Sequence, residues 1–130
     1  MNRTFIIGRV VRDAELKKVD VEGLPTSRCR FSVAVNETRA NGEKIVTYFE
    51  VTAWRNYADK IAKWLTKGRQ VHVEGAVRLN KYMDKNGNFR AVMQIHDPTV
   101  TFLGDKPEVA AEEEVPTFEE LDELEELPFE

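Results

Sequence analysis

The stretch "VTAWRNYADKIAKWLTKGRQVHVEG", residues 51–75, decides how this chain folds, because it changes from a strand pattern to a helix pattern and back. Its middle part, 56–68, carries large apolar residues at helical spacing: Tyr57, Ile61, Trp64 and Leu65. Such a stripe predicts one helix packed on a core. We expect Asn56 to cap the start of this helix and Gly68 to end it.

Strand patterns lie on both sides of the helix. Three precede it, at 4–12, 26–36 and 45–54, and the turn signal Asn41-Gly42 predicts a hairpin before the third. The run 69–82 follows, and the turn signal Asn86-Gly87 leads into "FRAVMQI" and "TVTFLG". Three strands, one helix and two strands is the order of an OB-fold, a five-stranded Greek-key β-barrel. A different small β-barrel or an open α+β sheet would give similar patterns.

Alternation within the strands separates a core face from an outer face. On 26–36 the inward set is Cys29, Phe31, Val33 and Val35, and the outward set is Arg28, Arg30, Ser32 and Asn36. On 69–82 the inward set is Val71, Val73, Val77 and Leu79, and the outward set is His72, Glu74, Arg78 and Tyr82. Phe49 and Trp64 are assigned to packing. Gly8 and Gly75, inside strands, fit the bends of a small barrel.

Charge divides the chain into two parts. Residues 1–104 hold 18 Lys/Arg against 11 Asp/Glu, whereas 105–130 hold one Lys against 12 Asp/Glu, so the net −4 of the whole chain combines +7 with −11. A basic body with an acidic tail points to a polyanion partner. The plainer alternative is a solvated basic surface and a tail that keeps the protein in solution.

Aromatic side chains on the outer face indicate what the polyanion is. On 45–54, Tyr48 and Trp54 share a face with polar residues between them, and Tyr82 lies on the outer face of 69–82. Aromatic platforms among cations bind unpaired bases and the phosphates that join them. Each residue also has a structural reading, in which Trp54 covers the core, Tyr48 lies in a subunit interface and Tyr82 covers a turn.

The body resembles the bacterial-type single-stranded DNA-binding proteins (SSB). The likeness runs through 1–104 and is carried by 51–75 together with "MNRTFIIGRVVRD", "RFSVAVNE" and "RLNKYMDKNGNFRAVMQI". It implies an OB-fold that binds single-stranded DNA without sequence preference and assembles as a homotetramer. It also implies that Tyr48, Trp54 and Tyr82 are the stacking residues. Where many members carry an aromatic, this chain has Arg39, which can stack on a base or pair with phosphate.

The basic residues that we expect to contact phosphate are Arg28, Arg30, Arg39, Arg55, Arg78, Lys81 and Lys85. We therefore predict a DNA-binding domain at 1–104 and a disordered acidic tail at 105–130. The resemblance implies that the tail ends in a tip that docks on replication, recombination and repair proteins. That tip consists of Asp122, Glu123, Leu124, Glu125, Glu126, Leu127, Pro128 and Phe129.

Two features of the tail bear on this prediction. Glu130 follows Phe129 and moves the terminal carboxylate away from it. An apolar residue recurs every third position at Phe118, Leu121, Leu124 and Leu127, either as a stripe that forms on a partner or as scattered residues of a solvated coil. The acidic tail can also lie on the basic groove and compete with phosphate.

Catalysis finds no support in the sequence. No phosphate-binding Gly-Lys-Ser/Thr loop is present, and Cys29, His72 and His96 are too scattered for a zinc site. We expect no cofactor, no metal, no membrane partner and a cytoplasmic location. The alternative function is an OB-fold adaptor or assembly subunit, whose outer aromatics bury in a protein interface.

Overall fold

The computed structural model describes residues 1–104 and Phe118. Its elements are, in order, β1 (Thr4–Val10), β2 (Glu15–Val21), β3 (Leu24–Thr38), β4 (Lys44–Trp54), α1 (Arg55–Ile61), the 3₁₀ turn η1 (Ala62–Trp64), β5 (Gln70–Met83) and β6 (Phe89–Leu103). None of the helices in this described part has the length and apolar character that a membrane crossing requires.

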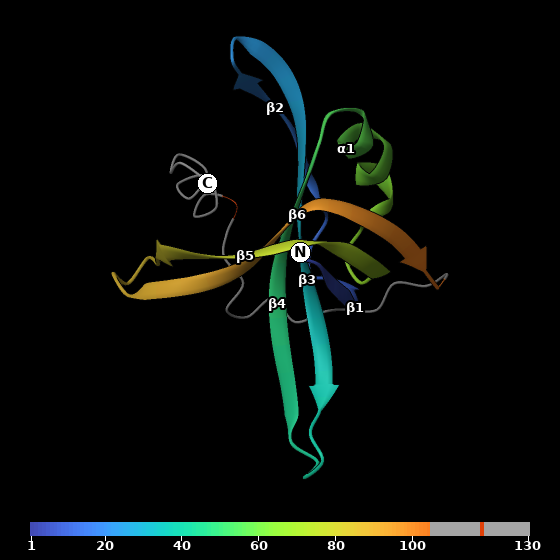
Figure 1. The fold of residues 1–130 in the computed structure, drawn as a ribbon, viewed down its shortest axis with the longest axis vertical. Coiled ribbons are helices and arrows are strands. Elements are labelled where there is room, and N and C mark those ends of the chain that lie inside the picture. Colours follow the sequence, from blue (N-terminus) through green and yellow to red (C-terminus); the bar gives the residue numbers. More distant parts are fainter. Residues whose placement is uncertain (105–117, 119–130) are drawn as a thin grey trace.

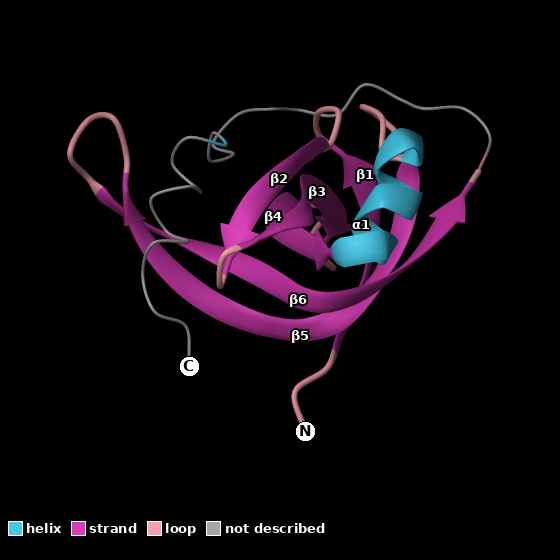
Figure 2. Ribbon diagram, turned by 90° about the horizontal axis from the view of Figure 1, so that it is seen from above, coloured by secondary structure: helices cyan, strands magenta, loops and turns pink. Residues whose placement is uncertain are grey.

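Five strands close into a barrel in the order β1-β5-β6-β4-β3, and β1 meets β3 again at Arg9 and Val10. The β4–β6 pairing is parallel and the others are antiparallel. Figure 2 shows β5 and β6 curving together beneath the other strands, with α1 at one side. This arrangement confirms the predicted OB-fold, with the helix between the third and fourth barrel strands.

Three hairpins extend beyond the barrel (Figure 1). The β3–β4 hairpin turns at Asn41-Gly42 and the β5–β6 hairpin at Asn86-Gly87, as predicted, and both glycines have positive φ. The third hairpin pairs β2 with the first part of β3 around Glu22-Gly23, and it is absent from our sequence prediction. The sheet therefore has six strands, of which β2 lies outside the closed barrel.

Two glycines allow the barrel to close and bend. A Cβ on Gly8 would lie 2.3 Å from the backbone oxygen of Ala34, where β1 crosses β3. A Cβ on Gly75 would lie 2.6 Å from the side chain of Ile95, and a β-bulge interrupts the β5–β6 register between Glu74 and Ala76. The structure confirms the bend at Gly75, and at Gly8 it shows a close backbone approach that a side chain would prevent.

The core combines the inner faces of the barrel strands with one side of α1. Cys29, Phe31 and Val33 of β3 are fully buried, and Ile61 and Leu65 cover them from the helix side. Phe49 packs against this cluster from β4, as predicted. Burial raises the pKa of the Cys29 thiol to about 12, so Cys29 is an apolar filler, as predicted.

The helix differs from the prediction. It begins at Arg55 after Trp54, and no side chain caps it, so Asn56 is not the cap. It ends at Ile61 and continues as η1. In this 3₁₀ turn, the rotation around the helix axis from one side chain to the next differs from that of an α-helix. Trp64 consequently leaves the buried stripe and is 53% exposed, so its assignment to the core is wrong. Gly68, beyond the helix, donates its N–H to Val10.

One inward assignment on β5 is also wrong. Val71 and Val73 are fully buried, but Leu79 is 60% exposed. The reason is that the last part of β5 leaves the barrel and pairs only with β6 (Figure 1). Strand alternation identifies the two sides of such an arm, but no core covers its inner side.

Candidate nucleic-acid interface

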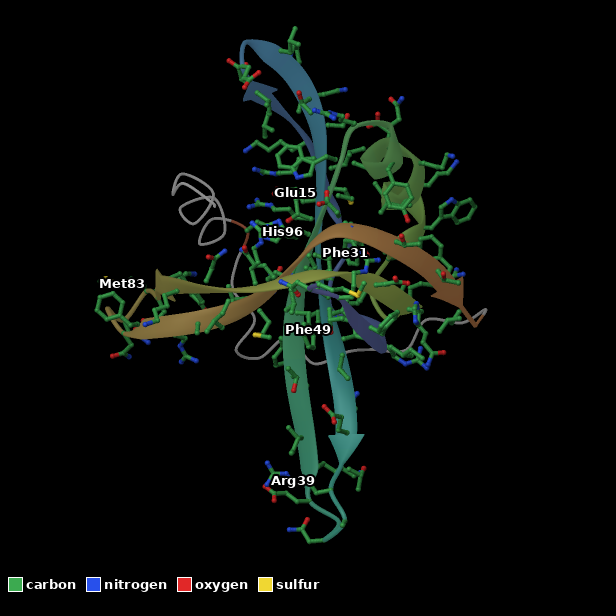
Figure 3. All side chains as sticks on the ribbon, in the orientation of Figure 1. Glu15, Phe31, Arg39, Phe49, Met83 and His96 are labelled. Atoms are coloured by element: carbon green, nitrogen blue, oxygen red, sulfur yellow. The ribbon has the colours of Figure 1, made fainter. Side chains whose placement is uncertain are left out.

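The outer face of the barrel presents polar residues in rows set by the strand register. One row runs through the paired residues Ser32, Glu50, Gln94 and Arg78, which come from β3, β4, β6 and β5. The neighbouring row runs through Arg30, Thr52 and His96. Four strands therefore contribute to one continuous polar surface, and Figure 3 shows His96 and Glu15 near its upper end.

The three predicted stacking aromatics border these rows. Tyr48 lies opposite Ala34 on β3, and Trp54 lies opposite Arg28. Both are half-buried, and neither belongs to the core cluster as it is seen in the described residues. Tyr82 is 8% exposed and packs with Val92 and Phe118 in a small second cluster, separate from the main core.

Trp54 lines a hollow of about 320 Å³ at the end of β4. The other lining residues are Val21, Thr26, Arg55 and Asp97. Arg55 has a φ of 62° at the start of α1, so the chain turns sharply there and its exposed side chain lies at the edge of the hollow. An aromatic wall beside a cation is suited to a flat ring joined to a phosphate.

Arg28 and Arg30 lie on the predicted face, but both are buried. Their side chains are 5% and 2% exposed. Glu15 of β2 accepts a hydrogen bond from Arg30 at 2.7 Å and lies 3.5 Å from Arg28. The β2–β3 hairpin supplies this carboxylate, so it holds the guanidinium groups in fixed directions.

A buried acid lies in the row next to Arg30 on the same face. Ser32 donates a hydrogen bond to Glu50 at 2.6 Å, and Glu50 is 2% exposed. Desolvation raises the pKa of Glu50 to about 8, although Ser32, Arg12 and Arg30 act in the opposite direction. Burial therefore favours the neutral form of Glu50. Because of this, the centre of the face carries less negative charge than the sequence indicates.

The other predicted cations are exposed. Arg78, Lys81 and Lys85 lie on β5 and at its hairpin turn. Arg39 lies at the tip of the β3–β4 hairpin and is 3.6 Å from Glu43 (Figure 3). Arg78 also contributes to a lowered pKa of the half-buried His96, for which desolvation is the larger cause. The structure thus separates a buried pair of arginines from an exposed set on the hairpins.

Three residues of this face were not predicted from the sequence: Glu15, Arg12 and Phe118. Glu15 was missed because the β2–β3 hairpin was missed, although Glu22-Gly23 is a turn signal between two short alternating runs. Arg12 lies two residues after the end of β1, and its guanidinium carbon lies 5.4 Å from the ring centre of Phe118. Phe118 is far away in sequence, and no local pattern could have placed it here.

The acidic tip, 122–129, lies outside the described residues. Within the described residues no group of three or more His, Cys, Asp or Glu side chains is arranged to hold a metal ion. The candidate site consists of the outer face and of the two hairpins that carry exposed cations, β3–β4 and β5–β6. Its chemistry is that of cations, aromatic rings and hydrogen-bonding side chains.

Comparison with known proteins gives a consistent result. The Single-strand binding protein family matches residues 1–103. Single-stranded DNA-binding protein 1 of Clostridium acetobutylicum is 32% identical over 110 residues, covering 83% of this chain and 98% of that protein. The Treponema pallidum single-stranded DNA-binding protein is 36% identical over 107 residues, covering 80% and 58%.

A solved structure shares the fold as well. The Plasmodium falciparum SSB in complex with ssDNA matches with a TM-score of 0.65 and 26% identity, covering 80% of this chain and 96% of that one. The family match extends over all of the barrel strands, including the face described above. This chain belongs to the single-strand binding protein family.

Proposed function

We propose that the protein binds single-stranded DNA without sequence preference across the outer face of β3, β4, β5 and β6. The observation that carries this proposal is the continuous outer surface, on which Tyr48 and Trp54 flank rows of polar and cationic residues. DNA rather than RNA is chosen because the named relatives are single-stranded DNA-binding proteins. Stacking and phosphate contacts alone do not detect the 2′-hydroxyl.

Stacking and charge have separate roles in the proposed binding. Tyr48, Trp54 and Tyr82 stack on bases, and each platform contributes about 1–3 kcal/mol without reading the base. Exposed cations such as Arg55, Arg78 and Lys81 contact phosphates and make the affinity depend on salt. The roles of such proteins in replication, recombination and repair are proposed for this chain by family membership.

The test is a titration of the full chain with oligo(dT), followed by tryptophan fluorescence at several salt concentrations. We expect strong quenching and an affinity that falls as salt rises. Trp54→Ala should weaken binding by about 1–3 kcal/mol and remove most of the quenching. Trp64→Phe is the matched control, because Trp64 lies by the helix and should leave the affinity unchanged.

An adaptor function is the alternative, in which the outer aromatics bury in a protein interface. Exposed apolar side chains away from the proposed DNA site support self-assembly, since Phe5 is 63% and Ile7 is 52% exposed on β1. We propose a homotetramer built partly through this strand. If Tyr48→Ala and Trp54→Ala dissociate the oligomer and leave the affinity for oligo(dT) unchanged, the adaptor function replaces the DNA-binding one.

We also propose that residues 122–129 recruit partner proteins. Pro128 restricts the chain, Phe129 enters an apolar pocket, and the preceding carboxylates meet a basic rim. Deleting 122–130 should leave oligo(dT) binding intact and abolish capture of replication and repair proteins. Deleting Glu130 alone places the terminal carboxylate on Phe129 and tests whether capture requires it there. If the chain that lacks 122–130 still captures these proteins, the proposed role of the tip is wrong.

A further inference from the structure

The hollow beside Trp54 has one carboxylate among its lining residues, that of Asp97. Asp97 is exposed, and its carboxylate makes no hydrogen bond or ion pair with any described residue. The β2–β3 hairpin and α1 extend on the same side of the barrel (Figure 1), and the hollow is lined by residues of both. The proposed function assigns base stacking to Trp54 and phosphate contact to Arg55, but it gives Asp97 no role.

Asp97 reaches the hollow because β6 carries an extra residue at this point. Ile95 and Pro98 are both buried, and two residues, His96 and Asp97, lie between them where strict alternation allows one. The β5–β6 register is interrupted opposite this point, and Asp97 has a positive φ of 52°. A β-bulge redirects side chains in this way. Asp97 therefore lies outside the core, like His96, although simple alternation would turn it inward.

The polar groups of the hollow differ in what they offer to a ligand. Arg55 donates hydrogen bonds and carries the charge that suits a phosphate. The Thr26 hydroxyl donates its hydrogen to the backbone oxygen of Leu24 at 3.1 Å, so its oxygen remains as an acceptor. The carboxylate of Asp97 also only accepts. A base that stacks on Trp54 in this hollow therefore meets acceptors, and it binds best when its edge carries donors.

The nucleobases differ in whether they carry such donors. Cytosine has an amino group at position 4, which a carboxylate can accept from, whereas thymine has a carbonyl oxygen at the same position. Uracil has the same oxygen and lacks the methyl group of thymine. Two oxygens that both accept repel each other, so the edge of thymine or uracil is poorly matched to Asp97. Cytosine and uracil have the same size, and comparing them isolates the edge of the base.

We propose that Asp97 makes the Trp54 hollow a base-selective subsite, in which its carboxylate accepts a hydrogen bond from the amino group of a stacked base and disfavours thymine and uracil. This proposal rests on the proposed function and deepens it, because it names the class of base that one subsite prefers. The other stacking platforms accept any base. Since DNA can shift its register along the face, the protein favours a base composition and still reads no sequence.

The first experiment measures the ratio of the Kd for oligo(dU) to the Kd for oligo(dC) of equal length, using the full chain and fluorescence anisotropy of labelled strands. Asp97→Gly should lower this ratio about three- to tenfold, the scale of one hydrogen bond to an exposed carboxylate. Glycine adopts a positive φ without strain, so the variant keeps the local fold. A ratio that stays the same or rises in Asp97→Gly overturns the proposal.

Glu22→Gly is the matched control. Glu22 is also exposed and also has a positive φ, of 53°, but it lies at the turn of the β2–β3 hairpin and does not line the hollow. Each variant loses one negative charge, so both should bind every strand slightly more tightly. The ratio should change in Asp97→Gly alone. An equal change in Glu22→Gly shows a general effect of charge and overturns the assignment of base selection to Asp97.

A second comparison tests whether Asp97 reads the base that stacks on Trp54. Asp97→Gly is introduced into the Trp54→Ala chain, and the same ratio is measured. Without the indole ring the base is not held beside the carboxylate, so Asp97→Gly should leave the ratio unchanged in this background. If Asp97→Gly lowers the ratio as much as it does in the parent chain, the two residues act independently and do not form one subsite.

Failure of this proposal and failure of the proposed function give different results. If the parent chain, Asp97→Gly and Glu22→Gly bind both strands with the same ratio, Asp97 does not select bases and the DNA-binding function stands. If none of these chains binds oligo(dU) or oligo(dC), the DNA-binding function itself fails.

Discussion

The two faces of β3 are equally buried but chemically opposite. Cys29, Phe31 and Val33 are fully enclosed on the inner face, and Arg28, Arg30 and Ser32 are at most 4% exposed on the outer one. The inner face is covered by the other strands and the helix, whereas the outer face is covered in part by ion pairs with Glu15 and by the ring of Phe118. Burial alone therefore does not separate the apolar residues of the core from the polar and charged residues of the outer face.

A substitution on the inner face of β3 should cause the largest loss of stability. Phe31→Ala removes a fully buried ring from the centre of the barrel and should lower the free energy of unfolding by about 3–5 kcal/mol. Phe89→Ala is the matched control on the β5–β6 arm, where the ring is 78% exposed, and should cost less than about 0.5 kcal/mol. Urea denaturation of both variants measures the difference, and similar losses contradict the distinction between core and arm.

The free energy of unfolding should depend on pH through Glu50, which lies on the outer face. Below pH 4.5 its carboxyl is protonated in the folded and unfolded chains alike, so it contributes no pH dependence. Between pH 4.5 and about 8 the unfolded chain releases this proton and the folded chain keeps it, so the free energy of unfolding falls as pH rises. Ser32, Arg12 and Arg30 face this carboxyl, and Gln94 is its register partner on β6.

Glu50→Gln removes the titration and keeps the shape of the side chain. We expect the variant to gain stability relative to the parent as pH rises from 5 to 8, as measured by urea denaturation at each pH. Glu43→Gln is the control, since it makes the same charge change at an exposed position. Parallel pH curves for the parent and Glu50→Gln would mean that Glu50 is already ionised in the folded protein at neutral pH.

Much of the inner face could be predicted from sequence. The alternation of 26–36 identified Cys29, Phe31 and Val33 as core, and the Asn-Gly pairs located two hairpins. These features are local, because strand period and turn chemistry are encoded by neighbouring residues. The OB-fold followed from the order of such local signals.

The outer face was predicted less completely, because it depends on contacts between distant residues. Alternation placed Arg28 and Arg30 on the outer side, but it carried no information about Glu15 or Phe118. Arg30 and Phe118 are 88 residues apart in the chain. The predictions that Trp64 and Leu79 are buried failed for a related reason. Spacing predicts which side a residue faces, but it does not predict whether another element covers that side.

A substitution of Arg39 at the exposed tip of the β3–β4 hairpin should have the smallest effect on stability, in contrast to one of the buried Arg30. The Arg39 side chain is 61% exposed, and its only described ion pair, with Glu43, is 3.6 Å long and open to solvent. Arg39→Ala should therefore change the free energy of unfolding by less than about 0.5 kcal/mol. If Arg39 contacts phosphate, the slope of log affinity for oligo(dT) against log salt should become shallower by about one unit.

Arg39→Lys then decides between the two ways in which this side chain can meet DNA. Lysine keeps the positive charge but lacks the flat guanidinium that stacks on a base. We expect Arg39→Lys to keep the parent affinity and salt slope, because an exposed side chain at a hairpin tip, with no described aromatic neighbour, is better suited to a point contact with phosphate. An affinity as low as that of Arg39→Ala would instead assign stacking to Arg39, and the tip would then share its chemistry with the buried arginines of β3.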